Sequence, residues 1–175
     1  MMIGRPAETE YAEWYAGYIR SVAEDGVLDL LRRQPAELTV LLVQVPAARE
    51  TYAYAPGKWT IRQVVSHLID GERVFGYRAF CIGHGETNPL PGFDENQYVV
   101  HSNAKDQPLT ALIDEFDKVR QANLACLERI DPSGWRNIGV ANSQPISTRA
   151  LAYIMAGHVR HHFGILQTRY GLAGS

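Results

Sequence analysis

The segment from Leu151 to Arg169 constrains the fold most, because it combines a helical pattern of apolar residues with two histidines. Positions three or four residues apart form one stripe: Leu151, Ile154, Met155, His158, His162, Ile165 and Arg169. This spacing predicts an amphipathic helix that turns the stripe toward a core. His158 and His162 then lie one turn apart on the buried face. Burying an imidazole without a partner costs about 1–3 kcal/mol, and a shared divalent metal ion removes that cost for both rings.

Three further segments repeat apolar residues at the helical period, and they cover residues 27–45, 60–83 and 108–130. Pro35 interrupts the first of them, which indicates either a kink or a second piece that begins there. The second starts at a capping box between Thr60 and Gln63. The last helix is expected to run from its cap at Ser147 to Tyr170. Because no segment alternates convincingly between apolar and polar residues, the sequence predicts an all-α four-helix bundle.

The segments between these helices are long enough to permit crossover connections as well as up-down ones. Residues 83–108 form the longest connection, between the second and third helices. Loops of this length are either functional covers or packed surface loops, and as a cover this one would lie over a bundle end and shape a pocket mouth. Residues 1–26 are expected to form an aromatic arm docked on the bundle. The whole chain, 1–175, is expected to form a single domain.

Composition excludes several classes of protein. The chain is 46% hydrophobic and 21% charged, as is typical of a folded protein. Its net charge of −2 gives no basic surface for nucleic acid or anionic membrane. No apolar run approaches the roughly 20 residues of a membrane span, and the N-terminus lacks the apolar core of a signal peptide. With two cysteines in the chain, a disulfide framework is excluded and a cytoplasmic location is expected.

A third histidine completes a candidate metal site. His67 lies at the inward edge of the stripe in the helix that starts at Thr60, whereas His84 and His101 belong to the long loop. His161 could compete with His162, but His162 continues the apolar stripe better. Three imidazoles on one side of a divalent ion leave positions open for water or substrate, which is typical of a catalytic site. Zinc is the metal favoured by this ligand set, with nickel, iron, copper and manganese as alternatives.

Better-known catalytic motifs are missing from the sequence. It contains no Glu-x-x-His, no Cys-x-x-Cys and no Gly-x-Ser-x-Gly, and Val159 replaces the glutamate of a zinc protease motif. Asp70 is the one nearby candidate for a general base or a group that orients His67. Alternatively, Asp70 and Glu72 are solvent-facing carboxylates paired with Arg73 or Arg62. Arg78 either meets an anionic substrate group or is simply exposed.

Three stretches of the sequence together resemble the DinB-like (DinB/YfiT-like) superfamily of metal-dependent enzymes: GKWTIRQVVSHLIDGER at 57–73, GFDEN at 92–96 and GHVRHH at 157–162. The resemblance covers nearly the whole chain from about residue 28 onward. It implies a four-helix bundle with crossover connections and a metal site formed by His67, His158 and His162. It also implies a homodimer, and relatives include transferases and isomerases that use low-molecular-weight thiols such as bacillithiol or mycothiol. Pro35 and His84 depart from the family pattern.

The preferred hypothesis is therefore a metal-dependent enzyme that acts on a small molecule, either by hydrolysis or by transfer of a thiol cosubstrate to an electrophile. The first alternative is a non-catalytic bundle that binds a metal or ligand as a stress or sensor protein. In the second alternative, the histidines only make core hydrogen bonds and the bundle serves as a dimerisation module.

Overall fold

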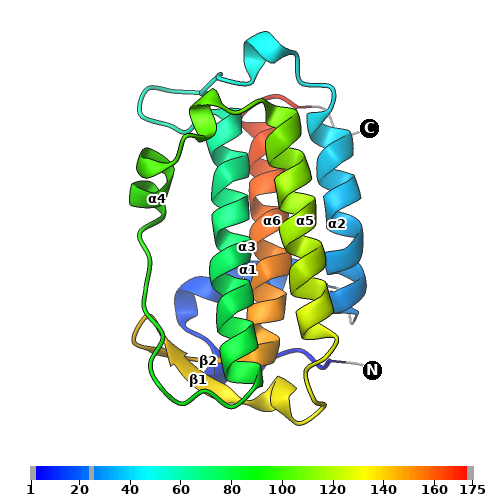
Figure 1. Ribbon diagram of the computed structural model, residues 1–175, viewed down its shortest axis with the longest axis vertical. Coiled ribbons are helices and arrows are strands. Elements are labelled where there is room, and N and C mark those ends of the chain that lie inside the picture. Colours follow the sequence, from blue (N-terminus) through cyan, green and yellow to red (C-terminus); the bar gives the residue numbers. More distant parts are fainter. Residues whose placement is uncertain (1–2, 24–25, 173–175) are drawn as a thin grey trace.

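The computed structural model describes residues 3–23 and 26–172. The described residues are mostly helical, and four long helices form a bundle (Figure 1). These helices are α2 (Val27–Leu42), α3 (Ile61–Gly83), α5 (Leu109–Leu127) and α6 (Thr148–Thr168). The bundle predicted from the helical periods is confirmed, and α2 runs unbroken through Pro35 rather than beginning a second piece there. No described helix has the length and apolarity needed to cross a membrane.

The four long helices are not arranged in the bundle in the order in which they follow one another in the sequence. Helices α2 and α3 each pack against both α5 and α6. In Figure 1, α3 and α5 descend through the bundle while α2 and α6 rise. Because α3 and α5 are parallel, the chain must return along the bundle between them, and α3 alone is about 34 Å long. This requirement explains the length of the connection between them.

That connection runs along the side of the bundle rather than over one end (Figure 1), so the expected position over a bundle end is wrong. It contains the short helix α4 (Glu95–His101) and a 3₁₀ turn, η4 (Ala104–Asp106). Asp94 caps α4, since its Oδ1 accepts hydrogen bonds from the backbone N–H groups of Asn96 and Gln97. His84 ends α3 and His101 ends α4.

A small hairpin corrects the prediction that the chain has no strands. Strands β1 (Ile138–Ala141) and β2 (Gln144–Ser147) pair antiparallel, with Val140 opposite Pro145, and they follow a 3₁₀ turn, η5 (Gly134–Arg136). Asn142 and Ser143 connect the strands with φ values of 51° and 61°. Two positive φ values are the geometry of a type I′ hairpin turn. Leu90 pairs with β1, which ties the segment after α3 to the hairpin.

The capped helix starts expected from the sequence are present. Thr60 accepts a hydrogen bond from the Gln63 N–H, and the Gln63 side chain accepts one from the Thr60 N–H. This reciprocal pair fixes the first turn of α3. Ser147 Oγ accepts a hydrogen bond from the Ala150 N–H at the start of α6. Both helices that carry the candidate metal ligands therefore begin at well-defined residues.

A buried ion pair joins the helices in the centre of the bundle. Arg120 of α5 donates to both carboxylate oxygens of Glu72 in α3, at 2.7 and 2.6 Å. Arg120 also donates to Gln34 Oε1 in α2, and Gln34 Nε2 donates to the Ala156 carbonyl in α6. Glu72 is 1% exposed, so the alternative of a solvent-facing Glu72 is wrong. A buried charge of this kind is tolerated because its partners satisfy it, and removing one partner is costly.

The N-terminal segment packs against α6. It comprises two 3₁₀ turns, η1 (Glu8–Glu10) and η2 (Glu13–Tyr15), and the short helix α1 (Ala16–Ser21). Gly157 permits the close approach, because a Cβ there would lie 2.2 Å from the Tyr18 carbonyl oxygen. Arg149 at the start of α6 donates to both carboxylate oxygens of Glu10, through Nε at 2.7 Å and through Nη2.

The Glu10–Arg149 pair predicts a pH-dependent contribution to stability. Hydrogen bonding to Arg149 lowers the Glu10 pKa from 4.5 to about 2. A carboxyl whose pKa is depressed on folding stabilises the protein above its ordinary pKa and loses this effect as pH falls through the folded value. Glu10→Gln should therefore lower the free energy of unfolding by about 1–3 kcal/mol at pH 7. The difference from the wild type should shrink between pH 4.5 and 2. Urea unfolding at several pH values measures it.

Glu13→Gln is the matched control, because Glu13 lies in the same segment and is exposed. It should leave the unfolding free energy within about 0.5 kcal/mol of the wild type. A Glu10→Gln effect that stays constant from pH 7 to pH 2.5 would contradict the assignment.

Candidate metal centre

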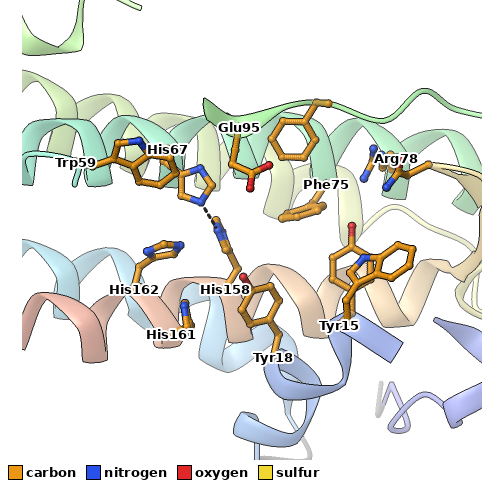
Figure 2. A pocket seen from close by; sticks show the side chains of 13 residues that line it. Tyr15, Tyr18, Trp59, His67, Phe75, Arg78, Glu95, His158, His161 and His162 are labelled. Atoms are coloured by element: carbon orange, nitrogen blue, oxygen red, sulfur yellow. Dashed lines mark hydrogen bonds between the residues drawn. The ribbon is translucent and has the colours of Figure 1, made fainter. Parts of the chain in front are cut away.

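Three histidines converge where α3 faces α6 (Figure 2). His67 comes from α3, and His158 and His162 come from successive turns of α6. The Nε2 atoms of His67 and His158 are 2.8 Å apart, and one ring nitrogen from each of the three residues lies within 4.8 Å of the others. Each pair of rings has its centroids 4.7 Å apart. The structure thus brings together the three residues singled out in the sequence, with His162 rather than His161 in the cluster.

Burial keeps these imidazoles neutral. His67, His158 and His162 are all less than 9% exposed. Desolvation, reinforced by neighbouring histidines, lowers the pKa of His67 to about 4 and that of His162 to about 3. The same causes lower the pKa of His158 well below 6.5. At neutral pH the rings therefore carry no charge, which is the state in which imidazole binds a metal.

Hydrogen bonding within the protein does not satisfy the cluster. The Nε2–Nε2 contact accounts for one hydrogen bond between His67 and His158. Within the described residues, the Nδ1 atoms of His67 and His162 are buried and have no hydrogen-bond partner. A zinc ion with Zn–N distances near 2.1 Å holds its nitrogens about 3.4 Å apart in a tetrahedral site. The 2.8 Å Nε2–Nε2 contact and the 4.8 Å upper limit on the ligand-atom separations are compatible with this value, so the three residues fit a divalent ion.

Neighbouring residues fix the orientation of the rings. Gly71 lies one turn after His67 in α3, and a Cβ there would be 2.8 Å from Cε1 and 2.9 Å from Nδ1 of His158. The missing side chain leaves room for the His158 ring. Trp59 packs against His67 with ring centroids 4.7 Å apart, and Tyr18 and Phe75 present edges to His158. The cluster is therefore held by packing on several sides.

The histidines lie at one end of a cavity of about 390 Å³. Its walls come from the N-terminal segment, α3, the long connection, the hairpin turn and α6. Aromatic side chains dominate the lining, which consists of Trp14, Tyr15, Tyr18, Trp59, His67, Phe75, Arg78, Phe93, Glu95, Asn142, His158, His161 and His162. A cavity of this size suits a small organic molecule rather than a macromolecule.

Glu95 is the only acid among the described residues that line this cavity. Figure 2 shows its carboxylate in the space between the histidines and Phe75. Glu95 was not predicted as a site residue from the sequence, although it lies within the GFDEN stretch. The sequence feature that could have pointed to Glu95 is Asp94, because an aspartate is a favoured N-cap and Glu95 is the first residue of the helix that Asp94 caps.

Asp70 lies elsewhere. It lines a separate hollow with Gln97, Tyr98, His101 and Ser102, and burial raises its pKa. Its Oδ2 atom is buried without a hydrogen-bond partner in the described part of the chain. The expected ion-pair partners are engaged with other residues, since Arg73 bonds to Glu115 and Arg62 to Glu50.

Arg78 is 2% exposed and lines the histidine cavity, so the alternative of an exposed arginine is wrong. The chain that follows α3 lies against Arg78, and Arg78 Nη2 donates a hydrogen bond to the Pro91 carbonyl at 2.6 Å. The periodicity of α3 alone could not predict this contact.

Comparison with known proteins agrees with this architecture. YfiT from Bacillus subtilis has a similar structure, with a TM-score of 0.75 and 20% sequence identity, over 96% of this chain and 94% of YfiT. YfiT is described as a probable metal-dependent hydrolase with an unusual four-helix bundle topology. The comparison with curated proteins found no match to the chain. The model of the DinB superfamily matches residues 30–166, so the chain belongs to the DinB superfamily.

Proposed function

We propose that the protein is a metal-dependent hydrolase that acts on a small molecule in the histidine cavity. His67, His158 and His162 hold one divalent ion, for which zinc is the best candidate. The observation that carries the proposal is the cluster of three buried, neutral imidazoles at the end of a cavity of about 390 Å³. Two of these rings have a nitrogen without a hydrogen-bond partner in the described part of the chain. The description of YfiT as a probable metal-dependent hydrolase supports the same reaction class.

The protein side chains have separate roles in this reaction. A divalent ion, when bound, supplies Lewis-acid chemistry that polarises the substrate and lowers the pKa of water toward neutrality. Glu95 accepts the proton of the attacking water as the new bond to the electrophilic carbon forms. Glu95 then donates that proton to the leaving group as the old bond breaks, so atoms and charge balance. The aromatic walls position the substrate and limit the access of bulk water.

Two other functions would use the same residues. In the first, a low-molecular-weight thiol replaces water as the nucleophile and Glu95 accepts its proton. In the second, the site catalyses no reaction and the protein senses a metal or a ligand. Hydrolysis is the function that we propose, because it is the reaction class given for the structurally similar YfiT.

The first prediction concerns metal content. Protein purified without a histidine tag should contain about one divalent ion per chain, because three ligands are already assembled. His158→Ala should lose that ion, whereas His161→Ala should retain it, since His161 lies next to the cluster but outside it. Elemental analysis measures the stoichiometry, and circular dichroism checks that both variants fold. A folded wild type that binds no divalent metal, even after incubation with zinc, would overturn the proposed function.

The second prediction concerns the general base. Glu95→Gln should reduce kcat for hydrolysis of a p-nitrophenyl ester by about 10²–10⁴-fold while leaving the metal content unchanged. Asp70→Asn is measured in parallel. Its location in the separate hollow predicts less than a tenfold loss. A large loss in Asp70→Asn with full activity in Glu95→Gln would assign the base to Asp70 instead.

The third prediction concerns the space beside His158. Gly71→Ala should weaken zinc affinity by about 10–100-fold, because its Cβ displaces a ligand ring. Gly164→Ala is the matched control, since a Cβ at this helical glycine meets nothing within 4 Å. It should leave zinc affinity unchanged and stabilise the protein by up to about 1 kcal/mol. Competition with a chromophoric chelator measures both affinities, and equal values for the two variants would contradict the assigned packing.

A further inference from the structure

Arg78 is a buried cation that has no carboxylate partner among the described residues. Its side chain is 2% exposed, yet no ion pair involves it within the described residues. Its hydrogen bonding there consists of the single bond from Nη2 to the Pro91 carbonyl, which leaves Nε and Nη1 free. Arg120, the other fully buried arginine of the described chain, is paired with Glu72. The Nε and Nη1 atoms of Arg78 are not among the buried, unpartnered atoms of the described residues, so they are open to the cavity that Arg78 lines, where a ligand can pair with the charge.

The free donors of Arg78 belong to the histidine cavity but lie far from the histidines. Arg78 and His67 both lie on α3, and eleven residues of helix separate them by about 16 Å along the axis. Both line the same cavity. Figure 2 shows Arg78 at one side of the cavity and the histidine cluster at the other, with Phe75 between them.

Asn142 adds a second polar group to the cavity. It lies in the hairpin turn and lines the cavity, and its Oδ1 would be 2.3 Å from a Cβ placed at Gly92. Gly92 follows Pro91, the residue that holds the Arg78 guanidinium, so Asn142 lies near the Arg78 end. Its side-chain amide makes no hydrogen bond within the described residues and can bind a ligand. An arginine and an amide together are well suited to a carboxylate or another oxyanion.

The space between the two ends is apolar and aromatic. Phe75 and Phe93 pack edge to face with ring centroids 6.3 Å apart, and Tyr15 meets Phe75 in the same manner. The Arg78 guanidinium itself lies 5.8 Å from the centre of the Phe93 ring. Aromatic walls of this kind favour an apolar or aromatic ligand body. In the metal-free protein, the Glu95 carboxylate near the histidines repels an anionic group and so favours the orientation in which that group lies at the Arg78 end.

We propose that the cavity binds a small organic anion whose oxyanion pairs with Arg78 and Asn142 and whose apolar body lies along Phe75 and Phe93. Combined with the proposed function, on which this part rests, the substrate is an amphipathic acid. Its hydrolysable bond lies at the end away from the anionic group. Arg78 then determines specificity through an ion pair made outside the reacting centre.

Binding to the metal-free protein tests this proposal without relying on catalysis. Three probes share one aromatic body: 4-phenylbutyrate, its neutral amide and 4-phenylbutyl phosphate. Titration calorimetry on chelator-treated, dialysed protein should show 4-phenylbutyrate binding about 10–100-fold more tightly than the amide, the range expected for a charge-assisted pair. Comparison of 4-phenylbutyl phosphate with 4-phenylbutyrate shows which oxyanion the site prefers. Equal affinity for acid and amide in the wild type would overturn the proposal.

Variants assign the discrimination to Arg78. Arg78→Gln should reduce the preference for the acid over the amide to less than about threefold, and Arg78→Lys should retain part of it. Arg73→Gln, which removes an arginine of the same helix that is paired with Glu115, should keep the wild-type preference. Discrimination that survives in folded Arg78→Gln would contradict the assignment. If Arg78→Gln does not fold, Asn142→Ala and Arg78→Lys must both weaken acid binding.

The two proposals fail separately. Loss of the acid preference in a protein that still binds one zinc ion would withdraw only the substrate class. A protein that discriminates between acid and amide but binds no zinc would withdraw the hydrolase and keep the anion site.

Discussion

Three neutral imidazoles are buried between α3 and α6, and the packing of these two helices determines the candidate site. Rings from two facing helices meet only if the helix axes are close and no side chain intrudes, which Gly71 ensures. The same burial lowers the pKa values of His67, His158 and His162, so the lone pairs that a metal needs are free at neutral pH. One packing arrangement therefore determines both the geometry and the protonation state of the cluster.

The buried network behind the cluster keeps this arrangement in register. Glu72 follows Gly71 directly and binds Arg120, which in turn binds Gln34. Gln34 donates to the carbonyl of Ala156, two residues before His158. The network thus joins all four bundle helices next to the metal ligands. The Arg120 charge also helps to lower the pKa of His158, so the network acts on the protonation of the cluster as well as on its position.

Local sequence patterns predicted the features that depend on neighbouring residues in the chain, namely the helices, their buried faces and their starts. The apolar stripe around His158 and His162 gave the helix and its inward face, and the Thr60–Gln63 box gave the start of α3. The hairpin was not predicted because its strands have only four residues each and contain Gly139 and Pro145. Its turn, at Asn142 and Ser143, also lacks the glycine typical of such turns. Glu95 and Arg78 depend on tertiary contacts: the long connection carries Glu95 into the cavity, and the Pro91 carbonyl buries Arg78. No periodicity in one helix reports such contacts. That the three histidines bind a metal stays a prediction.

X-ray absorption spectroscopy of the zinc-loaded, tag-free protein measures directly whether His67, His158 and His162 bind the metal. We expect a first coordination shell of about three imidazole nitrogens near 2.0–2.1 Å, completed by oxygen from water. The outer-shell scattering that imidazole rings produce should be lost in the triple variant His67→Ala/His158→Ala/His162→Ala. A shell containing sulfur, or a spectrum that is the same in the wild type and the triple variant, would contradict this expectation.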